Sequence, residues 1–140
     1  MPQFIAYLGF DGTCAEAMRF YAKIFSGKLE TLIRYADAPG AEEMPPAEGN
    51  RIMHANLVLH DGSSLMAGDA PGGQPFEGMK GCMLTMSYEN VAEATRTFEA
   101  LAAGGKVTMP LQETFWAERF GMLTDRYGTS WAINGGTRPM

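Results

Sequence analysis

Two short stretches of this sequence contain the side chains that could bind or transform a small molecule. In the first, residues 51–60, apolar residues alternate with a mixed set that includes His54 and Asn56, as in a strand with one face on a core. Imidazole exchanges a proton near neutral pH, which makes His54 the best candidate for a general acid or base. The alternative is a histidine that only satisfies a backbone carbonyl. His60 adjoins the Asp61-Gly62 turn, so we expect it to be exposed to solvent.

The second stretch, residues 112–116, places an amide, a carboxylate and two aromatic rings within five positions. Gln112 and Glu113 could bind polar groups of a ligand, with Glu113 as a hydrogen-bond acceptor or catalytic base, while Phe115 or Trp116 offers a ring for stacking. The alternative is that the two rings pack in a dimer interface or close the mouth of a cavity. Nearby, we expect Trp131 to lie in the core and Asp125 to brace a hairpin turn.

The elements that must position these residues occur twice. Residues 13–27 and 90–104 align at a constant offset of 77, and each predicts a helix with one apolar stripe. Thr13 and Asn90 are suitable N-caps, each followed three residues later by Glu. Gly27 and Gly104 are predicted to take the left-handed conformation that ends each helix.

The flanking segments repeat as well, so each half is predicted to be β-α-β-β-β. The predicted strands are residues 3–10, 28–35, 51–60 and 63–67 in one half, and 81–88, 106–114, 119–125 and 129–134 in the other. Turns at Asp61-Gly62 and Tyr127-Gly128 join the last two strands of each half. The sequence therefore predicts a single α+β domain over residues 1–140, with module one at 1–70, a linker at about 68–80 and module two at 81–136. Residues 37–50 are predicted to form a loop.

Several motifs in the same order resemble a known family. They are Ala6-Tyr7-Leu8-x-Phe10, Phe20-Tyr21, His54-Ala55, Leu65-Met66-x-x-Asp69, residues 112–117, and the long run of residues 120–134. Together they resemble the PhnB-like branch of the vicinal-oxygen-chelate superfamily, which includes glyoxalase I and bleomycin-resistance proteins. The resemblance implies a glyoxalase-like fold, in which two tandem βαβββ modules form a curled mixed sheet around a cavity, and it implies a homodimer.

In metal-dependent members of that superfamily, the first and last strands of both modules each supply one ligand to a divalent ion. The resemblance puts these positions at about Ala6, with Tyr7 as its neighbour, and at Met66, Met83 and Ala132. Such side chains offer almost nothing to a divalent cation, so we expect no metal and no cofactor. A displaced site using His54, His60 or Asp69 is the alternative, although the two histidines are about 20 Å apart on an extended strand. Some PhnB-like proteins also carry a demethylubiquinone methyltransferase label, but this sequence has no Gly-rich strand-to-helix loop for a nucleotide-like cofactor.

Composition narrows the classes of partner. The formal net charge is −5 and the 11 Lys and Arg residues are scattered, so no basic stripe is present to bind nucleic acid. No apolar run approaches the ~20 residues that cross a bilayer, and residues 1–3 lead into a strand rather than a secretion signal. We therefore expect a cytoplasmic protein with no membrane partner. Cys14 and Cys82 are expected to be buried free thiols.

Three functional hypotheses follow from these residues. The preferred one is a small-molecule-binding protein that lacks the standard metal site and binds through Tyr7, His54, Asn56 and the residues of the second stretch. The alternative is a metal-independent or displaced-metal enzyme, a lyase, isomerase or dioxygenase relative, that acts on a small oxygen-rich metabolite through His54, Glu113 or Tyr7. The third is a regulatory or structural homodimer with a vestigial pocket.

Overall fold

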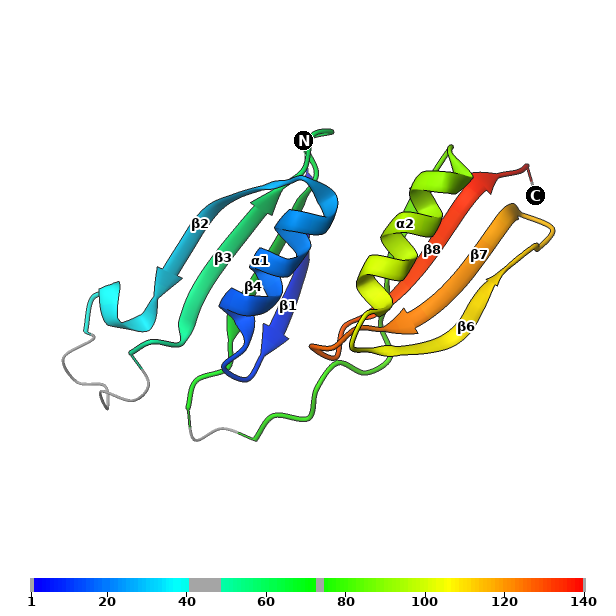
Figure 1. The fold of residues 1–140 in the computed structure, drawn as a ribbon. Coiled ribbons are helices and arrows are strands. Elements are labelled where there is room, and N and C mark those ends of the chain that lie inside the picture. The colour runs from blue at the N-terminus through cyan, green and yellow to red at the C-terminus, as the bar shows by residue number, and fades with distance from the viewer. Residues whose placement is uncertain (1, 41–48, 73–74, 140) are drawn as a thin grey trace. The chain divides into compact units, whose positions relative to one another are not determined.

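The computed structural model describes residues 2–40, 49–72 and 75–139, and shows two sets of four strands with one helix each (Figure 1). The first set comprises β1 (Ala6–Phe10), α1 (Cys14–Phe25), β2 (Lys28–Arg34), the short 3₁₀ helix η1 (Tyr35–Asp37), β3 (Ile52–Val58) and β4 (Ser64–Asp69). The second comprises β5 (Leu84–Tyr88), α2 (Val91–Ala102), β6 (Lys106–Gln112), β7 (Ala117–Thr124) and β8 (Ser130–Thr137). The predicted repeated α+β architecture is confirmed.

The chain divides into a first unit, Met1–Gly78, and a second unit, Met79–Met140. The strand order is β1-β4-β3-β2 in the first unit and β5-β8-β7-β6 in the second. In each sheet the first strand runs parallel to the last, while the other pairs are antiparallel. Each unit therefore has its own mixed sheet. That the two sheets enclose a common cavity stays a prediction.

In each unit the helix covers one face of the sheet (Figure 1). Side chains alternate between the two faces of a strand, so the buried residues Leu8, Ala55 and Leu57 mark the face of the first sheet that carries α1. In the second unit a Cβ on Gly121 would lie 2.7 Å from the ring of Phe98 in α2, which identifies the corresponding face there. Trp131 is 2% exposed, as expected of a core residue. The opposite faces, here called the helix-free faces, contain the candidate residues Tyr7, His54 and Asn56 in the first sheet, and Asn134 in the second.

The ends of the two helices differ more than the repeat suggests. Asn90 caps α2 as predicted, since its side chain accepts a hydrogen bond from the Glu93 amide, but Thr13 makes no such bond at α1. Gly104 has the predicted positive φ of 78°. After α1, however, it is Ser26 that adopts the left-handed conformation, with φ of 52°, and the prediction for Gly27 is wrong.

The predictions for the two cysteines and for the loop at residues 37–50 are also only partly confirmed. Cys14 is buried, but Cys82 is exposed because it precedes β5 and has no place in the sheet, so that prediction is wrong. The predicted loop at residues 37–50 starts with the end of η1, and its residues 41–48 lie outside the described part of the chain. Within that part, neither 12-residue helix is long or apolar enough to cross a membrane.

Candidate functional site

The first cluster of polar groups lies on the helix-free face of the first sheet, where β1 and β3 flank β4. The Tyr7 hydroxyl of β1 lies 3.3 Å from the carbonyl oxygen of Met53 and 3.3 Å from Nδ1 of His54, both of β3. The rings of Tyr7 and His54 are stacked, with centroids 5.8 Å apart and an interplanar angle of 25°. Two of the residues predicted to bind a ligand are thus in direct contact, although 47 positions separate them in the sequence.

Gly68 of β4 makes this contact possible. A Cβ on Gly68 would lie 2.9 Å from the Tyr7 hydroxyl oxygen and 2.8 Å from the Met53 carbonyl oxygen, closer than real Cβ contacts allow. Only glycine leaves room for the tyrosine to cross β4. Gly68 was not among the site residues predicted from the sequence, although a glycine inside a strand often marks such a close approach.

Asn56 lies in the next row of the same face. Tyr7 and Asn56 both pair with Met66 of β4, so the three residues form one line across the sheet. The Asn56 side-chain oxygen is buried and has no hydrogen-bond partner among the residues that the structure describes. Leaving a buried polar atom unpaired costs about 1–3 kcal/mol, so this oxygen is a favourable place for a donor from outside the protein.

Tyr7 itself stays a neutral phenol in this setting. Its side chain is 56% exposed, yet loss of solvent around it raises its pKa above the ordinary value of 10.0, with smaller contributions from Cys14 and Tyr35. At neutral pH the hydroxyl therefore donates one hydrogen bond and accepts others.

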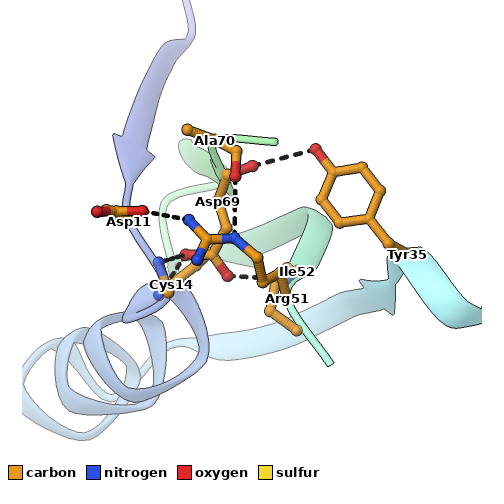
Figure 2. A network of polar contacts seen from close by, with 8 residues as sticks. Asp11, Cys14, Tyr35, Arg51, Ile52, Asp69 and Ala70 are labelled. Atoms are coloured by element: carbon orange, nitrogen blue, oxygen red, sulfur yellow. Dashed lines mark hydrogen bonds and ion pairs between the residues drawn. The ribbon is translucent and has the colours of Figure 1, made fainter. Parts of the chain in front are cut away.

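A buried carboxylate holds the elements of this site in place. Asp69 at the end of β4 is 4% exposed, and Figure 2 shows its carboxylate between the start of α1 and the start of β3. One oxygen accepts from the amides of Gly12, at 2.8 Å, and Cys14, at 3.0 Å. The other accepts from the Ile52 amide at 2.7 Å. Asp69 therefore supplies to α1 the cap that Thr13 does not, and it fixes β3 two residues before His54.

Polar contacts around Asp69 complete this brace (Figure 2). The Arg51 side chain donates to the Ala70 carbonyl at 3.0 Å and forms an ion pair with Asp11, while the Tyr35 hydroxyl donates to the Asp69 carbonyl at 3.1 Å. Cys14 is enclosed here, and burial, followed by the charge of Asp69, raises the pKa of its thiol to about 12. The Cys14 thiol is consequently protonated and inert at neutral pH.

The second cluster belongs to the second unit and is aromatic. Trp116 donates from Nε1 to the side-chain oxygen of Asn134 at 3.1 Å, and the Asn134 amide nitrogen contacts the Ser87 hydroxyl at 3.3 Å. The Trp116 ring packs edge-on against Phe115 and Phe120, with centroids 4.9 and 5.1 Å away. Phe115 is 73% exposed, so this cluster offers a ring surface whose inner member is held by hydrogen bonds.

The two polar residues predicted alongside these rings are placed less favourably for catalysis. Glu113 forms an ion pair of 2.9 Å with Arg138, which also donates to the Thr114 carbonyl at 3.3 Å. The Glu113 carboxylate is therefore engaged in an ion pair with a neighbouring cation. Gln112 is exposed at the end of β6, opposite Phe120 of β7. Asp125 does brace its turn as predicted, by accepting from the amides of Tyr127 and Thr129 and from the Trp131 indole.

The strand registers refine the metal positions that the resemblance implied. Met66 pairs with Tyr7 rather than Ala6, and Ala132 pairs with Thr85 rather than Met83. These pairings repeat at an offset of 78 between β1 and β5, from Tyr7 to Thr85, and at an offset of 66 between β4 and β8, from Met66 to Ala132. A neutral phenol, a thioether, an aliphatic hydroxyl and a methyl group do not fit a divalent ion. In the described ranges there is also no cluster of three or more His, Cys, Asp or Glu side chains that could hold one.

The chain is similar to several known proteins. Residues 2–134 match the family model described as 3-demethylubiquinone-9 3-methyltransferase. Protein YjdN of Escherichia coli is 36% identical over 137 residues, which cover 91% of each chain. The crystal structure of protein PA1353 from Pseudomonas aeruginosa is similar at 43% identity and a TM-score of 0.88, covering 96% of this chain and 98% of that one.

A Bacillus cereus structure described as a PhnB protein is also similar to this chain. It is 28% identical, with a TM-score of 0.80, and the match covers 96% of this chain and 99% of that chain. The chain is a PhnB-like protein of the family that the matching model describes. The same fold occurs in a glyoxylase/bleomycin resistance protein/dioxygenase domain from Frankia, at 20% identity, a TM-score of 0.62, and coverage of 97% and 96%.

The turn between β1 and α1 does not form a Gly-rich loop of the kind that binds a nucleotide-like cofactor. The turn between β1 and α1 is Asp11-Gly12-Thr13, with one glycine, and its amides face the Asp69 carboxylate rather than solvent. A Gly-rich loop that cradles a nucleotide-like cofactor needs free amides at this place.

Proposed function

We propose that this PhnB-like protein binds a small molecule on the helix-free face of its first sheet, through Tyr7, His54 and Asn56, without a metal ion. The observation that carries the proposal is the buried side-chain oxygen of Asn56, which has no hydrogen-bond partner among the described residues and lies in line with Tyr7 across one strand. A folded protein normally satisfies such an atom, so each exception calls for a physical explanation, and we propose that here a ligand supplies the missing bond.

The neighbouring residues support the same interpretation. Tyr7 and His54 combine ring surface with polar edges, which suits a small ligand that needs both contact area and orientation. In the second unit, the ring surface of Phe115 and Trp116, with Gln112 and Glu113 beside it, is our candidate for further ligand contacts. We also propose, as the resemblance implies, that the protein acts as a homodimer in the cytoplasm. Sedimentation velocity tests the dimer, and a fluorescent fusion tests the location.

A ligand screen tests the binding function. Chelator-treated protein is mixed with pools of small metabolites, and the unfolding temperature is recorded for the natural sequence and for Asn56→Leu. We expect at least one compound to stabilise the natural protein, with or without divalent ions. Its affinity should fall by about tenfold or more in Asn56→Leu, because one hydrogen bond is lost.

Asn50→Leu is the matched control, because Asn50 already accepts a hydrogen bond from Arg34 and lies outside the cluster. It should leave the affinity unchanged. Stabilisation that appears only with added metal would contradict the proposed site. So would a ligand that binds Asn56→Leu as tightly as it binds Asn50→Leu.

A further inference from the structure

The contacts of the Tyr7 hydroxyl decide which nitrogen of His54 carries a proton. The hydroxyl has one hydrogen and contacts two groups, the Met53 carbonyl and His54 Nδ1. A carbonyl only accepts, so its contact uses the tyrosine proton, and the second contact is then a hydrogen bond only if Nδ1 donates. Both contacts are satisfied when neutral His54 is the Nδ1–H tautomer. Its Nε2 is then an acceptor, and it has no hydrogen-bond partner among the described residues.

We infer that the site is an acceptor pair, His54 Nε2 and Asn56 Oδ1, which selects a ligand carrying at least two N–H or O–H donors and no anionic group. This inference rests on the proposed function and specifies its ligand. His54 and Asn56 are two positions apart on β3 and point to the same face, about 7 Å apart along the strand. A single small molecule can span that distance.

The strand residues paired around the acceptor pair include no side chain that could balance a negative charge. Tyr7, Met66, Asn56 and Thr31 form one row of the sheet, and the other pairings are Gly9 with Gly68 and His54 with Ile33. None of these eight residues is Lys or Arg. A carboxylate or phosphate would bring its own lone pairs toward the two acceptor atoms, and these residues include no cation to offset the repulsion. An amide, amidine or polyol would instead supply the hydrogen-bond donors that both acceptor atoms require.

Two probes of the same shape separate these chemistries. Benzamidine presents two donor NH₂ groups on a benzene ring, and benzoate presents two acceptor oxygens on the same ring. Their binding is followed through the side-chain signals of ¹⁵N-labelled protein. We expect benzamidine to perturb His54 and Asn56 and to bind at least tenfold more tightly than benzoate. In Asn56→Leu, the benzamidine affinity should fall by about tenfold.

The tautomer is measured on the same sample without a ligand. The ¹⁵N shifts should show His54 with a protonated Nδ1 and a bare Nε2. His60, the second histidine of the chain, is exposed at a turn and serves as the internal reference for an unconstrained ring. Tyr7→Phe keeps the ring but removes the acceptor, so His54 should move toward the His60 pattern.

An Nε2–H tautomer of His54 in the natural protein, or tighter binding of benzoate than of benzamidine, would overturn the acceptor pair. The proposed function fails differently. If a screened compound without two donors binds and Asn56→Leu abolishes its binding, the site stands and only the ligand class is wrong. If no compound binds in a way that depends on Asn56, the site itself is wrong.

Discussion

Asn56 and Asn134 lie on the helix-free faces of the two sheets but differ in their hydrogen bonds. The Asn134 side chain contacts Trp116 through its oxygen and Ser87 through its nitrogen, whereas the buried oxygen of Asn56 has no partner. A buried polar group that is paired stabilises a protein, and one that is unpaired destabilises it. This contrast is the reason that we assign a structural role to Asn134 and propose a binding role for Asn56.

Leucine substitutions convert this contrast into a stability measurement. Asn56→Leu should raise the free energy of unfolding of the ligand-free protein by about 1 kcal/mol, because it removes an unsatisfied atom at nearly constant volume. Asn134→Leu should lower it by about 1–3 kcal/mol, because it breaks a paired group and leaves the Trp116 indole without its acceptor. Urea unfolding curves measure both, and a loss of stability of the same size in the two variants would contradict the assignment of Asn56.

Cys14 gives the protein a specific sensitivity to alkaline pH. Burial, and then the charge of Asp69, raises the thiol pKa from 9.0 to about 12 in the folded protein. Below pH 9 the thiol is protonated in both the folded and unfolded chains, and its contribution to stability is complete. As the pH rises from 9 toward 12, only the unfolded chain ionises, so the free energy of unfolding should decrease by about 2 kcal/mol by pH 11.

Cys14→Ser is the comparison variant, since a hydroxyl of similar size does not ionise in this range. Its unfolding free energy should decline less between pH 9 and 11 than that of the natural protein. Parallel declines in the two proteins would show that Cys14 does not contribute to the alkaline loss.

At the scale of elements, the end of α1 is the place where the repeat is least exact. Ser26 adopts φ of 52°, a conformation in which glycine is favoured, while a Cβ on Gly27 would lie 2.8 Å from a methyl of Leu59 and 3.0 Å from one of Leu57. Ser26→Gly should therefore stabilise the protein by about 0.5–1 kcal/mol, and Gly27→Ala should destabilise it. Thermal unfolding of the two variants distinguishes these roles, and the reverse order would restore Gly27 as the left-handed residue.

The sequence predicted the order of helices and strands because apolar periodicity, helix caps and turn glycines are local signals. It did not predict the Tyr7–His54 contact, which depends on how β1 and β3 register against β4 and on the missing side chain of Gly68. It also did not predict that Asp69 caps α1, because the capping residue is 55 positions from Cys14. Contacts across a sheet depend on register, and the paired residues repeat at an offset of 78 between β1 and β5 and of 66 between β4 and β8, compared with 77 between the helices.

At the scale of the whole molecule, two units repeat one architecture but carry different chemistry. The first has a polar cluster that includes the unpaired oxygen of Asn56, and the second has aromatic rings, of which Trp116 donates to Asn134, and a Glu113–Arg138 ion pair. The resemblance implied metal ligands at about Ala6, Met66, Met83 and Ala132, and the strand pairings place Tyr7 opposite Met66 and Thr85 opposite Ala132. Binding through hydrogen bonds and ring surface, rather than through an ion, is consistent with all three observations.

The most direct measurement is a crystal structure of the chelator-treated protein with the most strongly stabilising compound from the screen. The account predicts donor groups of that compound within hydrogen-bond distance of Asn56 Oδ1 and His54 Nε2, beside the Tyr7 ring, and no metal ion between ligand and protein. A compound bound away from these residues, or one held by a metal ion that protein side chains coordinate, would contradict it.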